Sequence, residues 1–189
     1  MKLHLSIFLF YVFATLTTTA QKTSPKSKPK WGGIPNFDSL YRGKPYTNFN
    51  LTTLDGKAIN NDNSIGKVTI LNFWFESCMG CRAEFAELNE LYSRLKNDLK
   101  CQFVAVTFDE AASLPSFIKQ YNLNYPIATT GDHTAFHKLN YGMGCPSLII
   151  VDKNGVIATI GGYAVTIKDE KGRYDISIDK LLQQVKDLE

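Results

Sequence analysis

Two nearly continuous apolar stretches, with a helical pattern between them, dominate residues 46–189. Residues 68–75 and 103–108 are almost entirely apolar, which is typical of central strands buried on both faces. Across residues 79–99 the apolar side chains recur at helical spacing instead. These positions are Phe85, Leu88, Leu91, Tyr92, Leu95 and Leu99. Strand, helix and strand predict a right-handed βαβ unit and therefore an α/β protein.

Shorter elements are predicted on both sides of this unit. Asp55-Gly56-Lys57 indicates a hairpin turn, because Asp-Gly tolerates the positive φ that such turns need. Asp152-Lys153-Asn154-Gly155 indicates a second hairpin. The expected strands are 49–54, 58–59, 125–128, 147–151 and 156–160, and the expected helices are 111–121, 133–139 and 176–188. Residues 31–47 lack a clear period and are expected to form an extended arm.

The amino terminus has the pattern of an export signal. Lys2 precedes a mostly apolar stretch at 3–16, and Thr18-Thr19-Ala20 places small residues at a cleavage position. We predict a signal peptide over 1–20, cleaved after Ala20. The alternative is an uncleaved membrane anchor, but the apolar run is shorter than the roughly 20 residues that a membrane span needs.

The charge of the chain is concentrated in its first thirty residues. The formal net charge is +3, but residues 1–30 contain five lysines and no acidic residue. Without them, 16 basic residues face 18 acidic ones, so nothing favours nucleic-acid binding. Residues 21–30 form a solvated Lys/Pro/Ser-rich linker. Its lysines would support at most weak association with an anionic membrane surface.

The pair Cys78 and Cys81 follows the first buried strand and opens the predicted helix. A helix start offers unpaired N–H groups and the positive end of the dipole, which lower the pKa of a thiol there. Cys78 is expected to be the more exposed sulfur and the nucleophile. Cys81 lies three residues further on and can attack a mixed disulfide formed at Cys78.

Three other interpretations of these cysteines remain open. A structural disulfide is common in exported proteins, although a bridge across two residues constrains little of the chain. The cysteines could form half of a metal site with His133 and His137, which are four residues apart. Cys78 could also be a peroxidatic cysteine. On chemistry alone, a redox pair is favoured.

Three sequence elements resemble the thioredoxin superfamily. They are the segment NFWFESCMGCRAEF, the Gly144-Cys145-Pro146-Ser147 element and the VDKNG hairpin. Within the superfamily the chain is most similar to the exported TlpA/ResA-type thiol-disulfide oxidoreductases. The resemblance covers about residues 46–189, after a signal peptide at 1–20 and a linker and arm at 21–45. It implies a thioredoxin fold with an N-terminal β-hairpin, an inserted helix-strand unit and a central mixed sheet flanked by helices.

The resemblance also implies roles for individual residues. Glu84 would move protons between the thiols, although a first-turn acid also complements a helix dipole. Trp74 would lie beneath the site, where core packing alone would also explain it. Pro146 would be cis and pack against the cysteines, and the backbone of Cys145 would pair with an extended substrate. No cofactor beyond a redox-active Cys78–Cys81 disulfide, and no metal, is implied.

The chain departs from the family pattern at several positions. Gly80 replaces the usual proline before the second cysteine, and Asn72 stands where thioredoxins carry a buried aspartate. Ala86 replaces a helix-kinking proline, so we expect a straighter helix. Cys145 is unusual before the cis-proline; it could form another disulfide, help bind a metal or fill an apolar niche. Cys101 is expected to be buried and inert.

The leading hypothesis is an exported thiol-disulfide oxidoreductase in the periplasm or cell envelope, tethered to the membrane if the leader is uncleaved. It would reduce disulfides of partner proteins and receive electrons from an upstream thiol donor. One rival is a peroxiredoxin-like peroxidase, which Phe75 disfavours because a Thr or Ser normally stands there. The other is a copper- or metal-binding module that uses Cys78, Cys81 and Cys145 or a histidine.

Overall fold

The computed structural model describes residues 36–162, 166–168, 174–176 and 178–189. By internal contacts the chain divides into residues 1–34 and residues 35–189, and all of the described residues lie in the second unit. The predicted signal peptide and lysine-rich linker lie outside the described residues and stay predictions. Among the described residues, no helix has the length and apolar character needed to cross a membrane.

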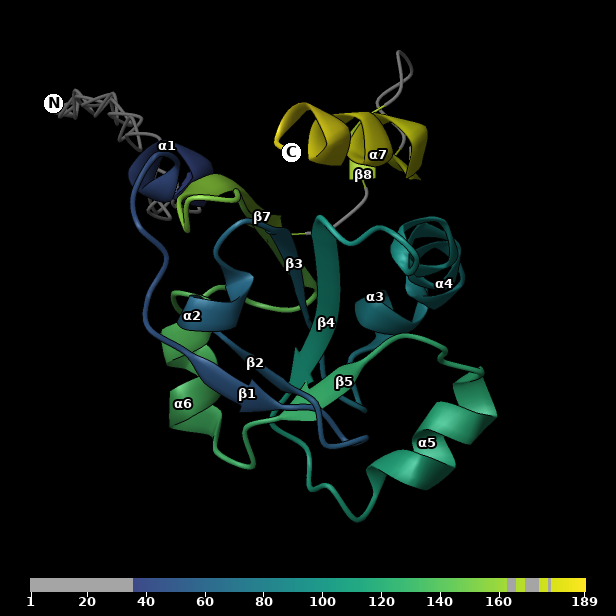
Figure 1. Cartoon of the computed structure of the whole chain (residues 1–189). Coiled ribbons are helices and arrows are strands. Elements are labelled where there is room, and N and C mark those ends of the chain that lie inside the picture. Colours follow the sequence, from purple (N-terminus) through teal and green to yellow (C-terminus); the bar gives the residue numbers. More distant parts are fainter. Residues whose placement is uncertain (1–35, 163–165, 169–173, 177) are drawn as a thin grey trace, which may run out of the picture. The chain divides into compact units, whose positions relative to one another are not determined.

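A five-stranded mixed sheet forms the centre of the unit, in the order β5-β4-β3-β6-β7 (Figure 1). Its strands are β3 (Val68–Phe73), β4 (Cys101–Thr107), β5 (Ile127–Thr129), β6 (Ser147–Val151) and β7 (Ile157–Gly162). β3, β4 and β5 run parallel, whereas β6 is antiparallel to both β3 and β7. The carboxyl ends of the three parallel strands therefore meet at one edge of the sheet, where α/β proteins place their sites.

Each face of the sheet carries its own hydrophobic cluster, because side chains alternate along a strand. Ile70 and Trp74 point to the face covered by α3 (Met79–Arg82), α4 (Phe85–Leu95), α5 (Leu114–Tyr121) and α7 (Ile178–Asp187). Leu71 and Phe73 point to the other face. That face is covered by α6 (His133–Leu139) and the hairpin of β1 (Asn50–Thr52) and β2 (Ala58–Asn60). A mixed sheet with helices on both faces matches the thioredoxin fold that the resemblance implies.

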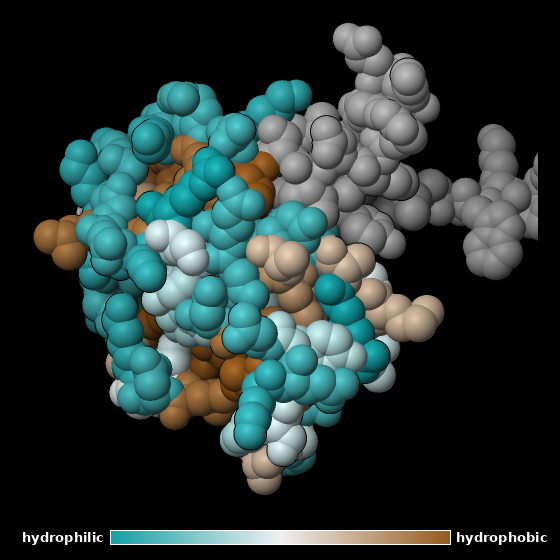
Figure 2. Space-filling view, turned by 90° about the vertical axis from the view of Figure 1, so that its right-hand side faces the viewer, coloured by the Kyte–Doolittle hydropathy of each residue, from teal (hydrophilic) through white to brown (hydrophobic). Residues whose placement is uncertain are grey.

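The predicted helix-strand insertion is present between β4 and β6. α5 carries a proline in its first turn, a position that needs no backbone N–H. It ends at Asn122, which adopts the left-handed conformation common after helices. The side of the molecule that carries α4 and α5 is turned toward the viewer in Figure 2, where hydrophilic residues cover much of the described surface and hydrophobic ones show between them.

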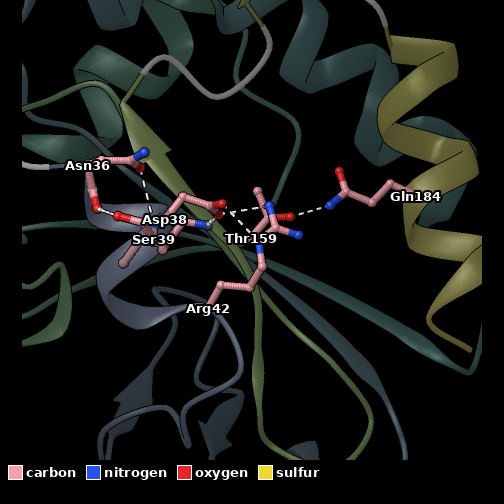
Figure 3. Close-up of polar contacts among 7 residues, drawn as sticks. Asn36, Asp38, Ser39, Arg42, Thr159 and Gln184 are labelled. Carbon is pink, nitrogen blue, oxygen red and sulfur yellow. Dashed lines mark hydrogen bonds and ion pairs between the residues drawn. The ribbon is translucent and has the colours of Figure 1, made fainter.

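Residues 37–41 and α7 both contact β7 (Figure 3). The expected extended arm is wrong over residues 37–41, which form helix α1 (Phe37–Tyr41). Asn36 caps this helix by accepting the N–H of Ser39, and Asp38 pairs with Arg42. Asp38 also accepts the Ile160 N–H, while Gln184 of α7 donates to Thr159. Local capping thus makes a helix of a stretch that is too short to show a period.

The expected single helix over 79–99 is also wrong. α3 and α4 are separate, and α4 ends at Leu95, so Leu99 is 89% exposed instead of facing the core. The straight helix predicted from Ala86 is therefore contradicted at Ala83 and Glu84. There the Glu84 N–H bonds the Cys81 carbonyl three residues back, which tightens the turn and ends α3.

Two further elements have no counterpart in the sequence pattern. The short helix α2 (Asn61–Ser64) begins with a reciprocal capping box between Asn60 and Asn63. A second two-stranded sheet pairs β8 (Thr166–Lys168) with β9 (Tyr174–Ile176). The closing helix, expected over 176–188, spans Ile178–Asp187 as α7.

Candidate active site

The cysteine pair lies directly beyond the carboxyl end of β3. Cys78 is the N-cap of α3, Cys81 lies within α3, and the two sulfurs are joined in a disulfide. Cys78 is 6% exposed and Cys81 is 2% exposed. As predicted, Cys78 is the more exposed residue of the two.

The sulfur of Cys78 faces a hydrogen-bond donor. The backbone N–H of Cys81 donates to Cys78 Sγ, with an N···S distance of 3.1 Å. The Cys78 N–H in turn donates to the Phe75 carbonyl, which closes a tight turn before the helix. A thiolate formed at Cys78 on reduction can accept the same N–H, so the backbone at this helix start stabilises negative charge on the sulfur.

A carboxylate from the neighbouring strand fixes the loop before the cysteines. Asp109, just beyond β4, accepts the Glu76 N–H at 2.7 Å and the Thr107 hydroxyl at 2.6 Å. The Glu76 side chain is only partly buried and accepts a hydrogen bond from the Ser113 hydroxyl. Glu76 therefore helps to fix this loop through its backbone N–H as well as through its carboxylate.

Arg82 ties the end of α3 back to the same loop. Its Nε and Nη2 donate to the Glu76 carbonyl at 3.2 and 2.6 Å. Its guanidinium also lies over the rings of Phe117 and Tyr121, at 5.6 and 5.2 Å from the centroids. Asp109 and Arg82 together hold the backbone of Glu76, two residues before Cys78.

Trp74 is fully buried in the hydrophobic cluster that also contains Cys78 and Cys81. Its ring stacks on Phe117 at 5.3 Å and meets Phe85 edge-on at 5.6 Å. The structure therefore places Trp74 within the packing beneath the cysteines. This location agrees with both alternatives for Trp74, core packing and support of the site.

Glu84 lies at the junction of α3 and α4, and its side chain is only 2% exposed. Burial raises the pKa of the Tyr125 hydroxyl above its usual range, and the nearby charge of Glu84 raises it further. Glu84 also occupies the N-cap position of α4, where an acid complements the helix dipole. Both interpretations of Glu84 therefore have a structural basis.

Cys145 precedes Pro146, and the peptide bond between them is cis, as the resemblance implies. The Cys145 thiol is free and half-buried, and it packs against the hydrophobic clusters on both faces of the sheet. Burial and the charge of Asp109 raise its pKa to about 12. The thiol is therefore protonated at neutral pH, which favours the apolar-niche interpretation over a third nucleophile.

The metal site proposed from the cysteines and histidines does not form. His133 and His137 lie on α6, which packs on the opposite face of the sheet from α3. In the described part of the chain, only Asp98, Cys101 and Glu189 bring three potential ligand atoms within 4.8 Å of one another. Cys101 is buried, as predicted, and burial with nearby Asp98 and Glu189 raises its pKa to about 12.

The sequence reasoning missed Asp109, Arg82 and Ser113. Asp109 had a usable signal, because it follows the second parallel strand and adjacent parallel strands end at the same edge. Arg82 and Ser113 had no such signal. Each of them bonds to Glu76, and only the fold brings them close to that residue.

A thioredoxin fold with a CxxC disulfide after one strand and a cis-proline before the neighbouring strand defines a thiol-disulfide oxidoreductase. The comparisons give the same class. Residues 42–160 match the AhpC/TSA family, and the chain belongs to this family, among relatives of the ResA thiol-disulfide oxidoreductases.

Two of the curated relatives show the degree of sequence similarity. The thiol-disulfide oxidoreductase ResA of Bacillus thuringiensis subsp. konkukian (strain 97-27) is 36% identical over 134 residues, which cover 69% of this chain and 76% of the relative. ResA of Bacillus thuringiensis (strain Al Hakam) is 33% identical over 128 residues, covering 67% and 72%.

Solved structures have a similar fold. A putative protein disulfide isomerase from Bacteroides thetaiotaomicron superposes with a TM-score of 0.63 at 22% identity, covering 78% of this chain and 89% of that chain. A putative thiol:disulfide interchange protein DsbE from Chlorobium tepidum gives a TM-score of 0.62 at 22% identity, covering 78% and 96%. The peroxidase alternative is not favoured, because Phe75 stands at the position of the expected hydroxyl.

Proposed function

We propose that this thiol-disulfide oxidoreductase is exported and reduces disulfides of partner proteins. The observation that carries the proposal is the Cys78–Cys81 disulfide at the carboxyl edge of the sheet, with the more exposed cysteine at a helix start. Curated relatives named thiol-disulfide oxidoreductase support the chemistry. The sequence of the leader supports export.

The reaction follows from the two sulfurs. In the reduced protein, the Cys78 thiolate attacks one sulfur of a partner disulfide, and the other partner sulfur leaves as a thiolate. Cys81 then attacks the Cys78 sulfur, which forms the Cys78–Cys81 disulfide and releases the second partner thiol. Two electrons pass to the partner, and an upstream thiol donor returns the protein to its reduced state.

Neighbouring residues are assigned supporting roles in this reaction. Glu84, buried beside α3, takes up and returns the Cys81 proton during the second step. The backbone at Cys145 and Pro146 pairs with an extended segment of the substrate. Trp74 supports the cysteines from below. The redox-active disulfide is the only redox group required, and the substrate is a protein, not a nucleic acid.

The location and the donor are the finer parts of the proposal. Export would place the domain in the periplasm or cell envelope, tethered to the membrane if the leader is retained. The lysines of residues 21–30 would add weak attraction to an anionic membrane surface. An exported compartment is oxidising, so the reducing direction depends on the upstream thiol donor.

Reduction of a model protein disulfide tests the chemistry directly. Cys78→Ser should reduce the rate to background, because no other described thiol occupies a helix start next to a resolving cysteine. Cys101→Ser is the matched control and should retain the rate. Equal activity of both variants would contradict the mechanism, and a reduction potential too high to reduce protein disulfides would contradict the direction.

A further inference from the structure

His133 and His137 of α6 bring two potential metal ligands together outside the cysteine site. They are one helical turn apart and share a face of the helix. Their Nε2 atoms are 3.0 Å apart, and their ring centroids are 4.2 Å apart with the rings nearly perpendicular. This contact brings one nitrogen of each imidazole to a common point.

The surroundings of the two rings hold this arrangement in place. The ring of Phe108 meets His133 edge-on at 4.8 Å, and Phe136 meets His137 edge-on at 5.6 Å. Phe136 is buried and anchors α6 to the sheet, while the Asp132 carboxylate caps the helix at Thr134 and Ala135. A chelating pair on packed rings loses little side-chain freedom when it binds a cation.

The orientation of His137 assigns its two nitrogens different roles. Its Nδ1 is buried, without a hydrogen-bond partner in the described part of the chain. Its Nε2 is the nitrogen that reaches His133, which is exposed. The only partner that His137 Nε2 has there is therefore a second imidazole, and neutral imidazole nitrogens are ligands for late transition metals.

We propose that His133 and His137 form a bidentate site for a divalent late transition-metal cation such as Ni²⁺ or Cu²⁺. Nitrogens at about 2.0–2.1 Å from one cation are about 2.9 Å apart at right-angled positions and about 3.3 Å apart in a tetrahedron. The observed 3.0 Å separation is that of a hydrogen bond between the metal-free rings, and it lies within a few tenths of an ångström of both values. Ni²⁺ and Cu²⁺ are favoured because they are the divalent first-row metals with high affinity for nitrogen ligands.

The remaining positions of the cation would be open to water or to another molecule. The described residues place no third cysteine, carboxylate or histidine ligand within reach of the two nitrogens. The site is also separate from the reacting sulfurs, since α6 covers the other face of the sheet. Loss of metal binding should therefore leave disulfide exchange intact, and the two proposals can fail independently.

Calorimetric titration of the oxidised full-length protein with Ni²⁺ tests the site. Ni²⁺ is preferred to Cu²⁺ as the probe because it does not oxidise the free thiols of Cys101 and Cys145. We expect one equivalent to bind. His133→Asn and His137→Asn should each weaken binding by at least about tenfold, since losing even an outer-shell partner of a ligand costs about 10–100-fold.

Two variants serve as controls for other nitrogen and sulfur ligands. His4→Asn removes the remaining histidine of the chain, and Cys101→Ser removes the thiol of the cluster formed by Asp98, Cys101 and Glu189. Both should bind Ni²⁺ as tightly as the unmodified protein. Absence of Ni²⁺ binding to the unmodified protein would overturn the proposal. Unchanged binding in either His133→Asn or His137→Asn would overturn it as well.

Discussion

Cys78 and Cys101 lie at opposite ends of neighbouring parallel strands and have opposite surroundings. Cys78 follows the carboxyl end of β3, and its sulfur accepts a backbone N–H at 3.1 Å. Cys101 begins β4, and its thiol faces Glu189 Oε1 at 3.7 Å, with the charge of Asp98 nearby. One sulfur meets the positive end of a peptide dipole, and the other meets carboxylates.

The comparison shows that burial alone does not separate the two cysteines, because Cys78 faces a backbone N–H whereas Cys101 faces carboxylates. Both residues are largely buried, at 6% and 9% exposure. Burial, followed by Asp98 and Glu189, raises the pKa of Cys101 to about 12, so its thiolate is scarce at neutral pH. The helix start at Cys78 instead favours negative charge on sulfur.

The largest expected effect is a difference in alkylation rate in the reduced protein. Iodoacetamide at pH 8 should modify Cys78 at least about a hundredfold faster than Cys101 or Cys145, because only thiolates react. The pKa of each of the two slow thiols is raised to about 12, so their rates should rise between pH 9 and about pH 12. Peptide mass spectrometry measures each site, and equal rates at pH 8 would break the comparison.

The same raised pKa values predict a dependence of stability on pH. Folding favours the protonated form of these thiols. Their contribution to the free energy of unfolding is therefore complete below about pH 9, where the thiols of the unfolded chain are also protonated. It is lost progressively as the pH rises toward about 12. Denaturation of the Cys101→Ser variant across this interval should show a weaker decline than the unmodified protein.

A smaller effect is expected from two matched glutamate substitutions. Glu84→Gln should slow disulfide exchange by about tenfold or more, because positioned acid-base groups contribute about 10²–10⁴-fold. It should also flatten the pH profile of the rate, which a merely structural role would not change. Glu189→Gln should leave exchange unchanged and lower the pKa of Cys101, so alkylation of Cys101 becomes faster. Exchange that is equally fast in both variants would remove Glu84 from the mechanism.

The smallest effect is expected for two matched aspartates. Asp109→Ala leaves the Glu76 N–H and the Thr107 hydroxyl without their acceptor, and should cost about 1–3 kcal/mol of unfolding free energy. Asp98→Ala removes one exposed hydrogen bond, to the Lys100 N–H, and should cost less. Urea denaturation compares the two, and an equal loss would show that the loop before Cys78 does not depend on Asp109.

Long, strongly patterned features of this molecule could be predicted from the sequence. The nearly continuous apolar run of β3 identified the central strand, and Cys78 and Cys81 followed it at the start of the predicted helix. The resemblance supplied the inserted α5 and β5 and the cis-proline at 146.

Features that depend on a single local contact escaped the sequence reasoning. Helix α1 depends on the cap at Asn36 and on docking of Asp38 to Ile160, more than a hundred residues away. The break before α4 arises where Glu84 turns into the interior, and no proline or glycine marks it. Asp109 and Arg82 support the cysteine loop through backbone groups of Glu76, which carry no residue-type signal.

Capture of the covalent intermediate tests the central claim most directly. A Cys81→Ser variant retains the Cys78 nucleophile but lacks the thiol that would release the partner. Incubated in reduced form with a disulfide-bonded protein, it should accumulate a one-to-one adduct whose cross-linked peptide contains Cys78. Absence of an adduct, or an adduct that persists when Cys78 is also replaced by serine, would contradict the assignment of Cys78 as the attacking sulfur.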